Sequence, residues 1–174
     1  VLPEDSVSDM CQKLFAAEMD AMEQTLGLLR PEAITAAGDL LAGAEKVLCM
    51  GQGGAMVMAQ EAAHLFSTAF SKYFPVCDSH LQSIAAAQLG PRDVILYISY
   101  SGATRDLLEI ARLAQEREAK LILITRFPKS PGAAMASVIA QLVNMLLMLV
   151  IFCLVRLRGN RDFRFSLSLG AGGY

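Results

Sequence analysis

The clearest indication of the fold is the segment Val47-Leu48-Cys49-Met50-Gly51-Gln52-Gly53-Gly54-Ala55. A short apolar run, a glycine-rich turn and a following helical segment are typical of a strand–loop–helix unit. The pattern returns at Val94–Ile98, which runs into Ser99-Tyr100-Ser101-Gly102-Ala103-Thr104. Strands that are apolar throughout and alternate with helices predict a parallel sheet covered on both faces.

Outward from these two units, strands and helices are expected to alternate. Further strands are predicted at Tyr73–Cys77 and Leu121–Thr125, and helices at Ala55–Ser71, at a short segment ending at Leu89, and at Thr104–Glu118. Two helices are expected over residues 6–44, capped by Ser6 or Ser8 and divided at Pro31. The predicted fold is α/β, a three-layer α-β-α sandwich with a mostly parallel, flavodoxin-like or Rossmann-like sheet. Residues 1–45 form its helical N-terminal segment, and residues 46–174 form the single domain on which that segment packs.

Composition indicates a globular chain with a large core. Of its 174 residues 54% are hydrophobic and only 18% are charged, which excludes a disordered tail. The formal net charge is −2, and no groove of Lys and Arg is visible in the body of the chain. Because nucleic-acid binding needs such a groove to release counterions from phosphates, this chain alone is not expected to bind DNA.

The cysteines predict a reducing compartment. Cys11, Cys49, Cys77 and Cys153 form no C-x-x-C pair, and each lies in an apolar run. They are expected to be buried free thiols, with neither disulfides nor a metal site. No basic segment precedes an apolar stretch at the start of the sequence, so no secretory signal is predicted and the expected location is the cytoplasm.

A long uncharged stretch leaves two interpretations open. No charge occurs from Gly132 to Val155. Its strongly apolar part, Leu142–Leu157, would span about 24 Å as a helix, short of a ~30 Å bilayer core. We therefore expect a helix over residues 138–157 that is buried in the core or in a homo-oligomer interface, with a membrane helix as the alternative. The alternation at 163–169 predicts a late edge strand.

The glycine-rich loop after the first strand suits an anion. Its residues are Gly51, Gln52, Gly53, Gly54 and Ala55, and the helix that follows offers free backbone N–H groups and the positive end of its dipole. Met56 stands where a dinucleotide fingerprint needs its third glycine, and no G-K-[ST] follows, so neither nucleotide motif is present. A simple tight turn is the structural alternative.

The loop after the Val94–Ile98 strand carries hydroxyls where a helix begins. Ser99, Ser101 and Thr104 can both donate and accept, so together they can surround a phosphate without Lys or Arg. Thr104 could instead serve only as a helix N-cap. No G-x-S-x-G elbow surrounds the serines, which argues against a serine nucleophile. His80, in the loop after the second strand, is a further candidate ligand contact.

These two loops resemble the signature of sugar isomerase (SIS) domains, which bind phosphosugars. Ser99, Ser101, Gly102 and Thr104 match S-x-S-G-x-T in full, whereas Ala55 replaces the serine of G-x-G-x-S and so removes one hydroxyl. Over residues 1–137 the chain resembles the effector domain of RpiR-type regulators, at Glu23-Gln24-Thr25-Leu26, Cys77-Asp78-Ser79-His80, Arg92-Asp93-Val94-Ile95, and Ile124-Thr125 leading to Ser130-Pro131. Such domains continue with a fifth strand and a loop before their last helix, whereas here Ala136-Ser137 runs straight into the apolar stretch, so either a stretch is deleted or an unresolved loop is absent from the chain.

The resemblance implies a phosphosugar-sensing domain of a transcription regulator of carbohydrate metabolism. It implies a sugar-phosphate ligand, no cofactor, a homodimer or tetramer, and DNA contact only through a helix-turn-helix domain outside these residues. The ligand-binding residues it implies are Gly51, Gln52, Gly53, Gly54, Ala55, His80, Ser99, Tyr100, Ser101, Gly102 and Thr104.

An enzyme is the main alternative, namely a small phosphosugar isomerase such as a 6-phospho-3-hexuloisomerase. Isomerisation needs an acid and a base around two adjacent carbons. Glu61 and His64 share a helix face, which is also the ordinary pattern of a solvated face, and no carboxylate or histidine occurs between Glu118 and Asp162. We therefore predict no catalytic residue. A membrane-associated protein held by residues 138–157 is the third interpretation.

Overall fold

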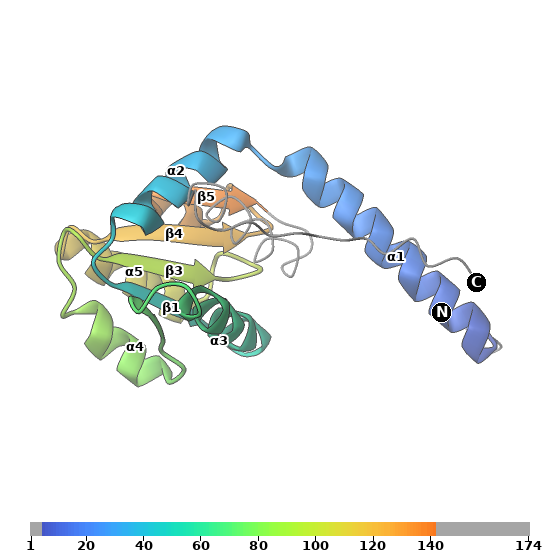
Figure 1. Ribbon diagram of the computed structural model, residues 1–174, viewed down its shortest axis with the longest axis horizontal. Helices are drawn as coiled ribbons and strands as arrows, with labels where there is room; N and C mark the ends of the chain where they lie inside the picture. The colour runs from blue at the N-terminus through green and yellow to red at the C-terminus, as the bar shows by residue number, and fades with distance from the viewer. Residues whose placement is uncertain (1–4, 142–174) are drawn as a thin grey trace.

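One five-stranded parallel sheet forms the centre of the molecule. The computed structural model describes residues 5–141 of the chain. The sheet contains, in chain order, β1 (Val47–Gly51), β2 (Tyr73–Pro75), β3 (Val94–Ile98), β4 (Lys120–Thr125) and β5 (Val138–Gln141). Their spatial order is β2-β1-β3-β4-β5, with every neighbouring pair parallel (Figure 1). This is the order of flavodoxin-like doubly wound folds, as the sequence predicts.

Helices cover both faces of the sheet and complete the predicted three layers. They are α1 (Val7–Leu28), α2 (Pro31–Gly43), α3 (Gly54–Ser67), α4 (Ser79–Ala86), α5 (Arg105–Glu116) and α6 (Pro131–Met135). One buried cluster joins α2 and α3 to one side of the sheet, and a second joins α4, α5 and α6 to the other.

The alternation of side chains along the central strands explains the two clusters. In β3, Val94, Leu96 and Ile98 face α2 and α3, whereas Ile95 and Tyr97 face α4 and α5. Successive strand residues point to opposite faces, so a strand between two helical layers must be apolar throughout. All five residues of β3 are buried, which explains its unbroken run of large side chains.

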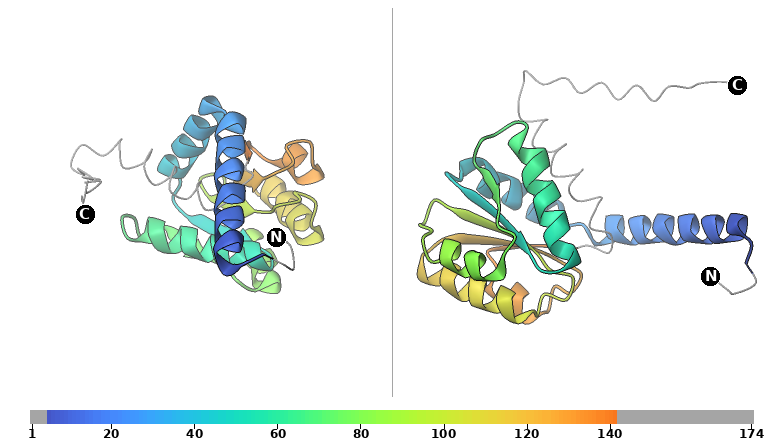
Figure 2. Two further views of the ribbon diagram at one scale, coloured as in Figure 1. Left: turned by 90° about the vertical axis from the view of Figure 1, so that its right-hand side faces the viewer. Right: turned by 90° about the horizontal axis from the view of Figure 1, so that it is seen from below.

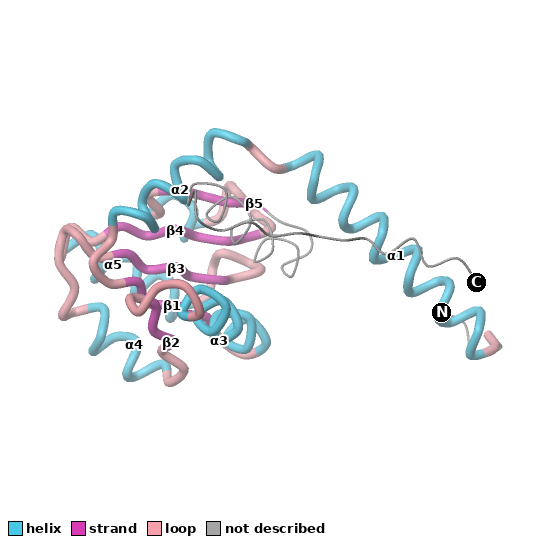
Figure 3. The backbone as a smooth tube through the Cα atoms, in the orientation of Figure 1, coloured by secondary structure: helices cyan, strands magenta, loops and turns pink. Residues whose placement is uncertain are grey.

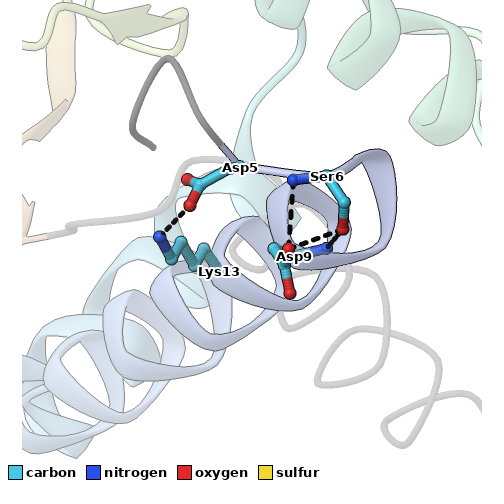
Figure 4. A network of polar contacts seen from close by, with 4 residues as sticks. All are labelled: Asp5, Ser6, Asp9 and Lys13. Carbon is cyan, nitrogen blue, oxygen red and sulfur yellow. Dashed lines mark hydrogen bonds and ion pairs between the residues drawn. The ribbon is translucent and has the colours of Figure 1, made fainter.

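The N-terminal helix α1 extends away from the sheet (Figures 1 and 2). It begins with a capping box, in which Asp9 N–H donates to Ser6 Oγ at 3.2 Å and Ser6 N–H donates to Asp9 Oδ2 at 3.0 Å (Figure 4). Because the Ser6 hydroxyl and backbone donate to its carboxylate, the pKa of Asp9 lies below its usual value. The exposed large apolar residues of α1 are Val7, Leu14, Phe15, Met19, Leu26 and Leu28.

The C-terminal part of the described chain differs from the prediction. Residues 138–141, expected to begin a long helix, form the edge strand β5, which pairs with β4 from Ile122↔Val138 to Thr125↔Gln141 (Figure 3). The β-branched pair Val138-Ile139 favours a strand, and Ser137 N–H bonds the carbonyl of Leu121 at 2.8 Å to start the ladder. The fifth strand, which the sequence analysis did not predict, is therefore present.

The end of β2 and the burial of two cysteines also differ from the prediction. The strand β2 ends at Pro75 rather than at Cys77, although Val76 N–H still donates to the Cys49 carbonyl at 3.1 Å. Of the cysteines expected to be buried, Cys49 is buried, whereas Cys77 is only partly buried and Cys11 is exposed on α1, which lies off the body. Cys153, the remainder of the predicted 138–157 helix and the predicted strand at 163–169 lie outside the described residues. Within residues 5–141 no helix has both the length and the apolar character needed to cross a bilayer.

Candidate functional site

The two predicted loops meet at the carboxyl edge of the sheet. β1 and β3 are direct neighbours, and their last residues, Gly51 and Ile98, are paired in register. The chain leaves β1 through Gln52 and Gly53 into α3, and it leaves β3 through the loop Ser99–Thr104 into α5. Ligands of open parallel sheets bind at this edge, beside the start of the following helices.

The glycine-rich loop has the backbone that a close ligand contact needs. Gly53 is the N-cap of α3 and has φ +58° and ψ −129°, a conformation that side chains with a Cβ rarely adopt. No side chain caps α3, and Gly53 and Gly54 are both exposed. The first turn of α3 therefore presents its backbone N–H groups to solvent, where an anion can bind.

In the second loop, both serines organise the backbone. Ser99 Oγ accepts a hydrogen bond from Gly102 N–H at 3.2 Å, and Ser101 Oγ accepts one from Ala103 N–H at 3.3 Å. The sequence offered no structural role for these hydroxyls, and the structure supplies one. Ser99 is buried and Ser101 is exposed, so Ser101 is the one that can donate its hydroxyl proton to a ligand.

Thr104 lies at the N-cap position of α5, but its hydroxyl does not cap the helix. Its Oγ1 is buried and has no hydrogen-bond partner among the described residues. The buried phenol of Tyr97 is its polar neighbour. Helix capping, the alternative to a binding role for Thr104, is therefore not what its side chain does.

The segment that contains Ser130 and Gly132, after β4, packs against Gly102 of the second loop. Gly102 has φ +61°, and a Cβ there would lie 2.1 Å from Ser130 Oγ and 2.9 Å from Thr125 Oγ1. Its carbonyl accepts a hydrogen bond from Gly132 N–H at 2.8 Å. The loop can take its shape only because residue 102 is glycine and Ser130 closes over it.

Two buried polar residues near the loops escaped the sequence analysis. Gln82, in α4, is completely buried, and its Nε2 donates to the carbonyls of Gly51 at 3.0 Å and Val76 at 2.7 Å. Tyr97 is completely buried, and its Oη has no hydrogen-bond partner among the described residues. Burial raises the pKa of Tyr97 to about 12, an increase that the nearby side chains of Thr104 and Gln52 partly oppose.

An exposed aromatic–guanidinium cluster adjoins the second loop. Arg126, the first residue after β4, donates to Tyr100 Oη, and its guanidinium carbon lies 5.6 Å from the centroid of the Tyr100 ring. The rings of Tyr100 and Phe127 meet edge to face, with centroids 5.8 Å apart. Tyr100 was expected from the sequence, but Arg126 and Phe127 were not, because their relation to it arises only when β4 pairs with β3.

The remaining candidates lie on helices rather than in the two loops. His80 is the second residue of α4 rather than part of a loop, since Asp78 accepts from Leu81 N–H at 2.8 Å and starts the helix early. Its imidazole is exposed and makes no hydrogen bond to any described residue. Glu61 and His64 are exposed in the second half of α3, His64 in its last turn. Within residues 5–141 no group of three His, Cys, Asp or Glu could hold a metal ion.

Known proteins resemble this chain in sequence and in fold. The family model described as the SIS domain matches residues 40–145. The HTH-type transcriptional regulator HexR of Escherichia coli is 33% identical over 125 residues, which are 70% of this chain and 42% of that protein. In fold the chain is similar to the Vibrio vulnificus NanR protein complexed with ManNAc-6P, with a TM-score of 0.84 at 19% identity over 88% of this chain and 64% of that one. It is also similar to the sugar isomerase domain of an RpiR transcription factor from Sphaerobacter thermophilus, with a TM-score of 0.80 at 21% identity over 84% and 89% of the two chains. The chain spans about half the length of the curated relatives that it matches.

Proposed function

Because this chain belongs to the SIS domain family, we propose that it binds a sugar phosphate at its two loops and senses that ligand for an RpiR-type regulator of carbohydrate metabolism. DNA would be contacted by a helix-turn-helix domain elsewhere in such a regulator, as the name of HexR suggests. A regulator works where the DNA is, so we expect the chain in the cytoplasm.

The observation that carries this proposal is the polar start of α5 at the carboxyl edge of the sheet. The Thr104 hydroxyl there does not cap the helix and is buried beside the Tyr97 side chain. With the exposed Ser101 and the N–H groups at the start of α5, it forms a set of donors suited to the oxygens of a phosphate. The first loop, with Gly53 and Gly54 exposed, is open toward the sugar part of such a ligand.

A sensor explains the site better than an isomerase does. Glu61 and His64 lie in the second half of α3, His64 in its last turn, whereas the phosphate would lie at the start of α5. A base and an acid must both come within about 3 Å of the reacting atoms, or act through one water. Asp106 lies in the first turn of α5 beside the second loop, and no described contact brings Glu61, His64 or His80 to that loop as its acid–base partner, so we propose binding without turnover.

We also propose that the chain forms a homodimer or tetramer. The α1 helix exposes Phe15 and Leu26 at 69% each, although it is 22 residues long and stands off the body (Figure 2). Isolated helices rarely hold without a packed apolar face, and large exposed apolar patches mark interfaces. A second copy of this chain is the partner that would cover α1.

A thermal-shift screen against sugar phosphates, each paired with its neutral sugar, tests the proposed ligand. A ligand that binds only the folded chain raises its stability by about 2.7 kcal/mol at a hundredfold excess over Kd. We expect one or more sugar phosphates to raise the melting temperature and their neutral sugars to leave it unchanged. No shift with any sugar phosphate, or equal shifts with the neutral sugars, would contradict the proposal.

A further inference from the structure

Arg126 is held in place on one side by two aromatic rings. Its guanidinium carbon is 5.6 Å from the ring centroid of Tyr100 and 5.9 Å from that of Phe127, and it donates to Tyr100 Oη. Its backbone is fixed as well, since its N–H donates to the Tyr100 carbonyl at 3.2 Å and its carbonyl accepts from Gln141 Nε2 at 3.3 Å. An arginine whose orientation is set before binding loses little entropy when it binds.

The charge of Arg126 is not compensated by an acid in the described part of the chain. No described carboxylate lies within 4.0 Å of it, whereas Arg92 pairs with Glu45 and Arg112 pairs with Glu109 and Glu116. The two aromatic rings contact the guanidinium and Tyr100 Oη accepts from one of its N–H groups, so its other N–H groups remain available. This residue therefore suits an anion that comes from outside the chain.

Arg126 also lies beside the loop to which the ligand was assigned. The residue that holds it, Tyr100, stands between Ser99 and Ser101, and Thr125 Oγ1 donates to the Tyr100 carbonyl at 3.1 Å. Two other cations occur near this edge, Arg105 and Lys129, and both are exposed and lack aromatic neighbours in the described chain. Hydroxyls and backbone N–H groups alone do not neutralise a phosphate, so a fixed positive charge here completes the site.

We propose that Arg126 is the cationic contact of the ligand's phosphate, and that Tyr100 and Phe127 are positioning residues that hold its guanidinium toward the Ser99–Thr104 loop. This inference rests on the proposed function and adds to it the charged group of the site. A charge-assisted hydrogen bond to phosphate requires the guanidinium, and its orientation requires the rings.

Titration calorimetry of the full chain with inorganic phosphate and with glucose 6-phosphate tests the proposal. Arg126→Met should weaken both ligands roughly ten- to a hundredfold and flatten the salt dependence of binding. Arg126→Lys keeps the charge but not the planar guanidinium, so its affinity for both ligands should lie between those of the native chain and of Arg126→Met. Arg117→Met removes an exposed charge at the other end of α5 and should change neither affinity.

A double-mutant cycle tests the positioning role. Tyr100→Phe keeps the ring but removes the Oη acceptor, so it should weaken phosphate severalfold in the native background and have no effect combined with Arg126→Met. Unchanged phosphate affinity in Arg126→Met with an unchanged melting temperature would overturn the proposal, as would an equal loss in Arg117→Met. If Ser101→Ala weakens binding while Arg126→Met does not, the proposed function stands and this inference fails. If the native chain binds neither ligand and no other sugar phosphate, both fail.

Discussion

Gln52 Nε2 donates a hydrogen bond to Gln82 Oε1 at 3.0 Å and so joins the glycine-rich loop to α4. The two residues are 30 positions apart, and Gln82 is completely buried. Because Gln82 also donates to the carbonyls of Gly51 and Val76, a single amide holds the ends of β1 and β2 together. The glycine-rich loop therefore has a rigid base.

Replacing Gln82 should destabilise the fold. Gln82→Met keeps the side-chain volume but leaves two buried carbonyls and the Gln52 amide without their partner, which should cost about 1–3 kcal/mol. The matched control is Gln88→Met, at an exposed position just after α4, which should stay within about 0.5 kcal/mol. Urea denaturation measures both, and equal midpoints for the two variants would contradict the assigned role of Gln82.

Replacement of glycine by alanine should change the stability of the fold in opposite directions at Gly102 and Gly38. Gly102→Ala forces a positive φ on alanine and drives its Cβ into Ser130 Oγ, so it should destabilise by more than about 1 kcal/mol. Gly38→Ala lies inside α2 with no atom within 4 Å of the added Cβ, so it should stabilise by about 0.5–1 kcal/mol. Thermal unfolding of the two variants checks the pair, and a stabilised Gly102→Ala would show that the loop is not constrained as described.

Tyr97 should titrate late and make the fold sensitive to high pH. Its pKa is raised to about 12 in the folded chain, because burial disfavours the phenolate, against about 10 in the unfolded chain. The stability associated with Tyr97 is therefore fully present below pH 10 and is lost as the pH rises toward 12. Ultraviolet titration of tyrosine absorbance should lose a component near pH 12 in Tyr97→Phe. Loss of a component near pH 10 instead would refute the buried environment of Tyr97.

Charges on α1 should dissociate the proposed oligomer. Phe15→Glu places a carboxylate on the exposed apolar surface of α1 and removes a side chain whose burial is worth about 1.5–3 kcal/mol. Sedimentation equilibrium should show a homo-oligomer for the native chain and a lighter species for Phe15→Glu. Gln12→Glu adds the same charge at an exposed polar position of α1 and should leave the mass unchanged. A native chain that sediments as a monomer contradicts the proposed assembly.

Features that depend on residues close together in the sequence could be predicted from it. The apolar run Val94–Ile98 and the hydroxyls after it indicate β3, its loop and the start of α5, because the burial of a strand and the start of a helix depend on a few consecutive residues. The strand β5 was missed because Val138-Ile139 continues into a longer apolar stretch, where a buried strand and a buried helix have the same composition.

The residues that complete the site depend on contacts between distant positions. Arg126 meets the Tyr100 ring 26 positions away, and Gln82 reaches the Gly51 carbonyl across 31. An arginine after a strand and a glutamine in a short helix are ordinary in sequence. Only the parallel pairing of β3 with β4, and the packing of α4 below β1, give them partners.

Calorimetric titration of Ser101→Ala with a sugar phosphate that the native chain binds is the most direct test of the assigned ligand site. Ser101 is exposed in the second loop and contributes little packing, so the variant should keep its melting temperature. Its affinity should fall by about 1–3 kcal/mol, because a charge-assisted hydrogen bond to the phosphate is lost. Ser71→Ala, an exposed serine after α3, should bind like the native chain. The same Kd for Ser101→Ala and the native chain would show that the sugar phosphate does not bind at the Ser99–Thr104 loop.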